Sequence, residues 1–227
     1  MTGPAGSVRV LANAMIDGRA MGAIALTFLL ASLTLPTRPQ TPARVTLGPS
    51  QCVRCHTPQA AWWVNDDGPP PRGHVSTLLQ LETADARRYA QRLGLADVYA
   101  TSASCVACHA TVFRGDAREG VSCEGCHGAG SAYLEVHAQP GAYRLAVDAG
   151  MTDLVGNVKA WTTRCLECHL ITDAPLVAAG HSTGKTFNLA DKYQVVAKHW
   201  KQTYQAAEVA AAAREATTRM LAASHGR

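Results

Sequence analysis

Apolar residues recur at helical spacing along much of this chain, and no stretch shows the alternation typical of a strand. The periodicity is clearest at the C-terminus, where apolar positions from Leu189 to Ala207 repeat at steps of three and four residues. Asn188 can cap this segment, and we expect one helix over residues 189–223, about 50 Å long. Thr83 is a second N-cap, for a helix that ends at Gly94. The pattern predicts a mainly α-helical fold with extensive loops.

The longest apolar run lies near the N-terminus, at residues 20–35, and Pro36 ends it. Sixteen residues are long for the core of a signal peptide and short for a full membrane span, which needs about 20. Residues 1–35 are therefore expected to be either a cleaved signal peptide or a retained N-terminal membrane anchor. Residues 36–49 form a Pro-rich linker, and residues 50–227 have the length of one domain.

Four copies of the motif Cys-x-x-Cys-His account for all eight cysteines of the chain. In each copy the two thiols can bond to the vinyl groups of one haem, and the adjacent histidine can reach the iron. A zinc half-site or a thioredoxin-like redox pair would not need a histidine after every pair. The sequence therefore predicts four covalently bound haem c groups. The motif residues are Cys52, Cys55 and His56; Cys105, Cys108 and His109; Cys123, Cys126 and His127; and Cys165, Cys168 and His169.

The composition agrees with a polypeptide that surrounds cofactors. Only 6% of the residues are aromatic, which is few for a conventional core, and four porphyrins would supply apolar mass. We therefore expect a multihaem cytochrome c fold wrapped around four covalently bound haems. The formal net charge is +4, but the haem propionates would add about eight negative charges. No run of Lys and Arg occurs, so nucleic acid is not an expected partner.

Five histidines remain outside the motifs as candidates for the second axial position on iron. Beyond residue 35 only Met151 and Met220 could give the alternative His/Met ligation, so bis-histidine ligation and low potentials are favoured. His181 is either a further ligand or a loop residue near a propionate, and His225 is expected to be solvated. The remaining three are predicted ligands: His74, His137 and His199.

The block GVSCEGCHGAGSAYLEVH, residues 120–137, resembles the third-haem signature of the tetrahaem cytochrome c-554 family of multihaem c-type cytochromes. The order of motifs, tryptophans and histidines over residues 51–204 is also similar. The resemblance implies a stacked pair formed by the second and third haems. It further implies that His137 serves the first haem, His74 the third and His199 the fourth, while the second haem has no distal protein ligand.

Two features depart from the family pattern. The segment 65–73 lengthens the spacing between the tryptophans and His74. His181 lies in a Gly-His segment that resembles haem-ligating Gly-His-Pro loops of larger multihaem cytochromes, but Ser182 replaces the proline. His181 could therefore close either the fourth or the second haem.

The favoured function is a periplasmic tetrahaem c-type cytochrome that transfers electrons between redox partners through closely packed, mostly bis-histidine haems. One alternative is an enzyme whose second haem is five-coordinate and acts on nitric oxide, hydroxylamine or nitrite. Another is a subunit of a polymeric cytochrome wire. The protein is expected to be exported, either soluble or N-terminally anchored, and its C-terminal helix could join copies into a homo-oligomer. No catalytic residue is predicted for the electron carrier.

Overall fold

The structure, a computed structural model, describes residues 43–65, 73–100, 104–196, 198 and 204–225. The chain divides into two units, Met1–Thr41 and Pro42–Arg227. The expected signal peptide or membrane anchor, residues 1–35, lies outside the described residues. Among the described residues, no helix combines the length and the apolar character needed to cross a membrane.

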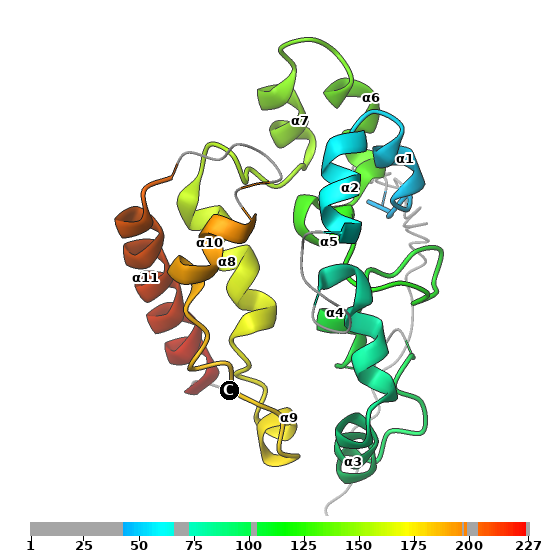
Figure 1. Cartoon of the computed structure of the whole chain (residues 1–227), viewed down its shortest axis with the longest axis vertical. Helices are drawn as coiled ribbons and strands as arrows, with labels where there is room; N and C mark the ends of the chain where they lie inside the picture. Colours follow the sequence, from blue (N-terminus) through cyan, green and yellow to red (C-terminus); the bar gives the residue numbers. More distant parts are fainter. Residues whose placement is uncertain (1–42, 66–72, 101–103, 197, 199–203, 226–227) are drawn as a thin grey trace, which may run out of the picture. The chain divides into compact units, whose positions relative to one another are not determined.

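Helices joined by loops make up the described part of the second unit (Figure 1). Within the described residues, the β-type pairing is one isolated bridge between Phe113 and Asp116. The predicted mainly helical fold is therefore confirmed, while the number of enclosed haems stays a prediction. The elements are α1 (Ser50–Val53), α2 (Thr57–Asn65), η1 (His74–Glu82), α3 (Ala84–Leu93), α4 (Val106–His109), α5 (Cys123–His127), η2 (Gly130–Ala132), α6 (Leu134–His137), α7 (Tyr143–Ala149), α8 (Val158–His169), α9 (Ala174–Ala178), α10 (Leu189–Val196) and α11 (Ala206–His225).

Helix α3 begins where its cap predicts. The Thr83 side chain accepts a hydrogen bond from the Ala86 N–H at 3.2 Å, an interaction that typically stabilises a helix by about 1 kcal/mol. The helix ends before Gly94, whose φ of 66° is left-handed. Asn188 likewise caps α10, because its side-chain oxygen accepts from the Ala190 N–H at 3.2 Å.

The C-terminal segment is two helices, and the single helix expected over residues 189–223 is wrong. Helix α10 ends at Val196, residues 204 and 205 are not helical, and α11 begins at Ala206. The Gln205 N–H donates to Glu208 Oε2 at 2.8 Å, which satisfies one of the N–H groups that a helix start leaves without a partner.

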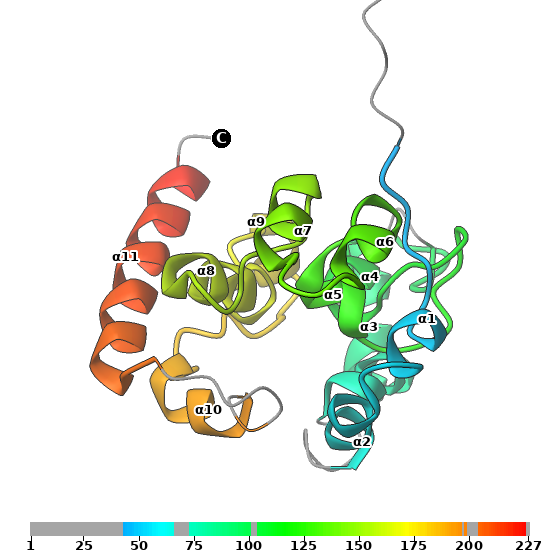
Figure 2. The ribbon, with the colours of Figure 1, turned by 90° about the horizontal axis from the view of Figure 1, so that it is seen from above.

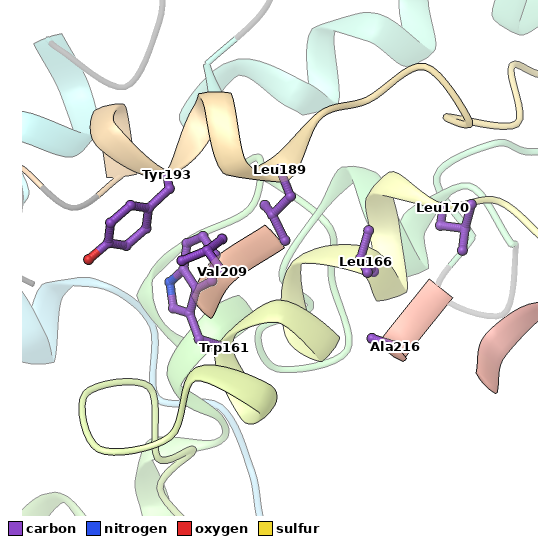
Figure 3. Packing of buried hydrophobic residues seen from close by; sticks show 7 residues of the cluster. All are labelled: Trp161, Leu166, Leu170, Leu189, Tyr193, Val209 and Ala216. Atoms are coloured by element: carbon purple, nitrogen blue, oxygen red, sulfur yellow. The ribbon is translucent and has the colours of Figure 1, made fainter. Parts of the chain in front are cut away.

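The burial of apolar side chains explains why this segment forms two helices and not one. Helices α8, α10 and α11 enclose the main apolar cluster; Figure 2 shows α11 beside α8, and Figure 3 shows the side chains of the cluster. A straight helix would carry the apolar side chains of α11 away from α8 and leave them in water. The Ala-rich start of α11 thus packs on its own chain, and the homo-oligomer stays a prediction. The buried members are Trp161, Leu166, Leu170, Leu189, Tyr193, Val209 and Ala216.

The 3-10 helix η1 lies against the backbone that precedes the third motif. Thr77 Oγ1 is 2.9 Å from the His109 carbonyl and accepts a hydrogen bond from the Val121 N–H at 3.1 Å. Gly120 permits this approach, because a Cβ there would lie 2.6 Å from a backbone carbonyl of η1. Helix η1 therefore carries its first residue, His74, to the cysteine motifs.

Candidate functional site

Each Cys-x-x-Cys-His motif includes a helical turn. The His56 N–H donates to the Cys52 carbonyl at 3.0 Å, and the His109 N–H donates to the Cys105 carbonyl at 3.0 Å. The third motif is α5, and the fourth ends α8. Residues at positions i, i+3 and i+4 share one face of a helix, so both thiols and the imidazole of each motif lie together. No two of the eight cysteines form a disulfide, so each is available for attachment to haem.

Thiols of different motifs lie side by side in two pairs. A hydrogen bond between Cys52 and Cys123 raises the pKa of Cys52 and lowers that of Cys123, and burial raises the pKa of Cys52 further. A hydrogen bond between Cys108 and Cys168 likewise raises the pKa of Cys108 and lowers that of Cys168 to about 7. The first motif is therefore next to the third, and the second is next to the fourth.

The third and fourth motifs also meet. Arg164, which immediately precedes Cys165, donates a hydrogen bond to the Gly125 carbonyl inside the third motif. Burial raises the pKa of Cys165, and the neighbouring charge of Cys126 raises it further. The contacts of the described thiols thus follow the order first, third, fourth, second motif.

This order differs from the stacked second and third haems that the family resemblance implies. The second and third motifs are close in sequence, and the segments beside them do meet: the Ser122 N–H donates a hydrogen bond to Thr111 Oγ1 at 2.9 Å. The thiol of Cys108, however, has the fourth motif as its neighbour: Cys108 Sγ lies 3.9 Å from the Glu167 carbonyl. The thiol contacts pair the second motif with the fourth.

His56 of the first motif faces His137 at the end of α6. Their Nε2 atoms are 3.4 Å apart, and their rings lie at 17° with centroids 5.6 Å apart. Burial lowers the pKa of His56, and the nearby His137 lowers it further, which favours the neutral imidazole that binds metals. Two imidazoles on opposite sides of one metal have their nitrogens about 4 Å apart, because each bond is about 2.0 Å. The pair therefore fits an iron between its two Nε2 atoms.

His109 of the second motif has His181 as its neighbour, with ring centroids 6.3 Å apart. His109 Nδ1 is 3.1 Å from the Thr77 carbonyl, and His181 Nδ1 is 2.8 Å from the Ser182 carbonyl. Since these carbonyls can only accept, both Nδ1 atoms carry the proton and both Nε2 atoms are left to bind a metal. Burial lowers the pKa of His109, which again favours the neutral ring.

His169 of the fourth motif lies beside His74, with ring centroids 5.9 Å apart and planes at 90°. The resemblance assigns His74 to the third motif, whereas this contact places it at the fourth. Phe187 stacks on the His169 ring at 4.1 Å and 8°. His199, which the resemblance assigns to the fourth haem, lies outside the described residues, and the side chain of His225 is likewise not described.

The three histidine pairs share one spacing. Two imidazoles bound to the same iron place their ring centres about 6 Å apart, given metal–nitrogen bonds of about 2.0 Å. The separations here are 5.6, 5.9 and 6.3 Å, and each pair joins one motif histidine to one histidine from elsewhere in the chain. These donors fit bis-histidine iron. The residues present are therefore suited to haem.

The sequence reasoning missed Glu124, which lies between the two cysteines of the third motif. Its side chain is 3% exposed and accepts hydrogen bonds from the N–H groups of Leu47, Gly48 and Gly130, at 2.6 to 2.9 Å. A variable motif position gives no signal of such a role. Glu124 fixes the segment that leads into the first motif against the third.

Among known proteins, one family model matches part of this chain, residues 51–128. No curated protein and no solved structure matches the chain. The matched segment, about a third of the chain, includes the first three motifs and His74. The resemblance seen in the motifs is thereby confirmed over this segment. Residues 51–128 match the family of cytochrome c554 and c-prime.

Proposed function

We propose that this protein is a periplasmic tetrahaem c-type cytochrome that transfers electrons between redox partner proteins. The observation that carries the proposal is the pair His56 and His137, whose Nε2 atoms face each other at 3.4 Å from segments 81 positions apart. A polar surface histidine has no reason to meet a motif histidine in this way. Two further pairs with the same spacing support bis-histidine ligation at more than one iron.

When bound, haem supplies a one-electron iron couple, and a second protein ligand favours electron transfer over the binding of small molecules. The chain holds the imidazoles in place before any ligation. The carbonyls of Thr77 and Ser182 fix the protonated nitrogens of His109 and His181. Rings that are already oriented change little when the iron changes charge, which suits a carrier.

The order of the motifs supports passage of electrons through one chain. The first motif contacts the third through Cys52 and Cys123, and the second contacts the fourth through Cys108 and Cys168. Arg164 joins the third to the fourth. Haems attached to these thiols would be neighbours in a series of four, with the first and second motifs at its ends.

The test uses the full chain produced in a host that attaches haem c and exports the product. The intact mass and the pyridine haemochromogen absorbance should both give four haems per chain. The reduced protein should pass electrons to an oxidised small c-type cytochrome, and it should not turn over nitrite or hydroxylamine. Fewer than four haems, or steady turnover of either substrate, would contradict the proposal.

A matched pair of histidine variants tests the ligation. His137→Ala should convert one low-spin haem per chain to high-spin, because it removes one axial ligand. His225→Ala, at a histidine that is not a predicted ligand, should leave the spectrum unchanged. Equal spectra for the two variants would argue against His137 as a ligand.

A further inference from the structure

Helix α3 holds the loop that contains His181. The Arg92 guanidinium donates a hydrogen bond to the Ala179 carbonyl at 2.8 Å, two residues before the histidine. The Tyr89 ring, one turn earlier on the same helix, lies 5.7 Å from the His181 ring at an interplanar angle of 48°. Two side chains of one helix therefore contact the histidine and its supporting backbone.

The loop itself has a conformation that suits only glycine at its key position. Gly180 has a φ of +100°, and a Cβ there would lie 3.0 Å from Arg92 and 3.4 Å from Tyr89. The His181 N–H then donates to the Leu176 carbonyl of α9 at 3.0 Å. The backbone, the Nδ1 atom and the ring face of His181 are thus each fixed by a separate contact.

This much restraint is unusual for a loop histidine that is solvated. Free side chains on loops keep their rotamer freedom, and ordering one costs free energy unless something is gained. The ring that His181 meets is His109, at the 6.3 Å separation that suits a shared iron. The fourth motif is served differently, since the ring beside His169 at 5.9 Å is His74.

We propose that His181 is the distal ligand of the second haem and that Tyr89 and Arg92 are positioning residues that hold it there. The inference rests on the proposed tetrahaem function and concerns the one iron that the family resemblance leaves open. In this chain the protein itself would supply the distal ligand of that iron. Exogenous ligands such as cyanide or nitric oxide then bind only after His181 leaves.

The first measurement is an electron paramagnetic resonance spectrum of the ferric full-length protein, with haem counted by mass in the same sample. Four haems per chain without a high-spin signal are expected. Four haems with one high-spin haem per chain, whose signal is lost when Cys105→Ser and Cys108→Ser remove the second attachment site, would overturn the inference and leave the proposed function standing. Fewer than four haems would overturn the proposed function itself.

Variants assign the ligand to one iron. His181→Ala should produce one high-spin haem per chain, and added imidazole should restore the low-spin signal. In a chain that also carries Cys105→Ser and Cys108→Ser, which removes the second attachment site, His181→Ala should add no high-spin signal. A high-spin signal that persists in this chain would assign His181 to another haem and overturn the inference.

The positioning residues have their own readout. Arg92→Ala should give a partial high-spin signal and faster cyanide binding, and Arg92→Lys, which can still donate to the Ala179 carbonyl, should restore the parent spectrum. Gly180→Ala should act in the same direction. Its matched control is Gly141→Ala, at a φ of +73° with open space around the position, which should leave the spin state unchanged. A low-spin Arg92→Ala protein that binds cyanide at the parent rate would remove α3 from the proposal.

Discussion

Glu124 Oε2 accepts a hydrogen bond from the Gly48 N–H at 2.7 Å, so a carboxylate inside the third motif is bonded to the backbone just before the first. The same carboxylate also serves Leu47 and Gly130, and it is buried. One side chain therefore joins three backbone segments. Hydrogen bonds to a buried carboxylate stabilise the fold more than hydrogen bonds to a neutral acceptor. If the acceptor is lost, no water takes its place at a buried N–H group.

Replacing Glu124 by Ala should lower the free energy of unfolding of the holoprotein by about 3 kcal/mol or more, because two buried N–H groups and one part-buried N–H group lose their acceptor. Denaturant unfolding followed by far-ultraviolet circular dichroism measures the change. Glu135→Ala, on the exposed face of α6, should stay within about 0.5 kcal/mol of the parent. A loss no larger than that of the control would show that the carboxylate is not needed.

Gly120→Ala should move η1 away from the third motif. The new Cβ would meet backbone carbonyls of η1, which cannot rotate away as a side chain can. We expect a loss of about 1–3 kcal/mol, the range for overpacking, together with a changed spectrum of the haem that His74 serves. Gly156→Ala is the control, because its Cβ would meet only the Asp153 side chain, at 3.1 Å. Unfolding curves that coincide for the two variants would contradict the close approach.

Stability should fall at high pH partly through Tyr204. Burial raises the pKa of Tyr204 to about 12, and its hydroxyl lies 2.9 Å from the Val155 carbonyl and 3.1 Å from the Leu154 carbonyl. An unfolded tyrosine has a pKa of about 10, so the folded state favours the neutral phenol. This contribution is complete below pH 10 and is lost as the pH rises through 12.

Tyr204→Phe should therefore cost about 1 kcal/mol at pH 8, where the hydrogen bond is intact. Between pH 10 and 12 the variant should lose less stability than the parent, because the titrating group is gone. Unfolding midpoints measured across this range for both proteins give the comparison. Parallel pH profiles would exclude a contribution from Tyr204.

Ala216→Leu tests the packing of α11 on α8. Ala216 is 1% exposed within the apolar cluster, so three added carbons should cost about 1–3 kcal/mol. Ala211→Leu makes the same change on an exposed position of the same helix and should be nearly neutral. Thermal unfolding of both variants gives the comparison. If Ala211→Leu were the more damaging, the exposed face would carry a contact that the isolated chain lacks.

The parts of the fold that depend on local signals are the parts that the sequence predicted. Thr83 and Gly94 mark the ends of α3 because capping and left-handed geometry are properties of single residues. The break before Ala206 was missed because the apolar spacing that starts at Leu189 runs on through Ala207, a position that the structure leaves exposed. Only the distant contact of Val209 with α8 selects a reversal.

In the candidate site, too, the sequence predicted the local features and not the contacts between distant segments. The Cys-x-x-Cys-His motifs are local, and each includes a helical turn as expected. Which motif lies next to which depends on contacts across the whole unit, such as Cys52 with Cys123, and no spacing in the sequence encodes them. The family resemblance implied the pairing of His56 with His137, and the structure brings these two rings together. The resemblance also assigned His74 to the third motif, whereas in the structure the His74 ring contacts His169 of the fourth motif.

The return of α11 onto α8 has a consequence for how the protein is made. The fourth attachment motif ends α8, and Cys165 packs against the cluster that α11 completes. Without α11 packed on α8, Cys165 would lose part of this cover, and its thiol would be open to haem attachment. We therefore expect the docking of α11 on α8 to follow the covalent attachment of haem at the fourth motif.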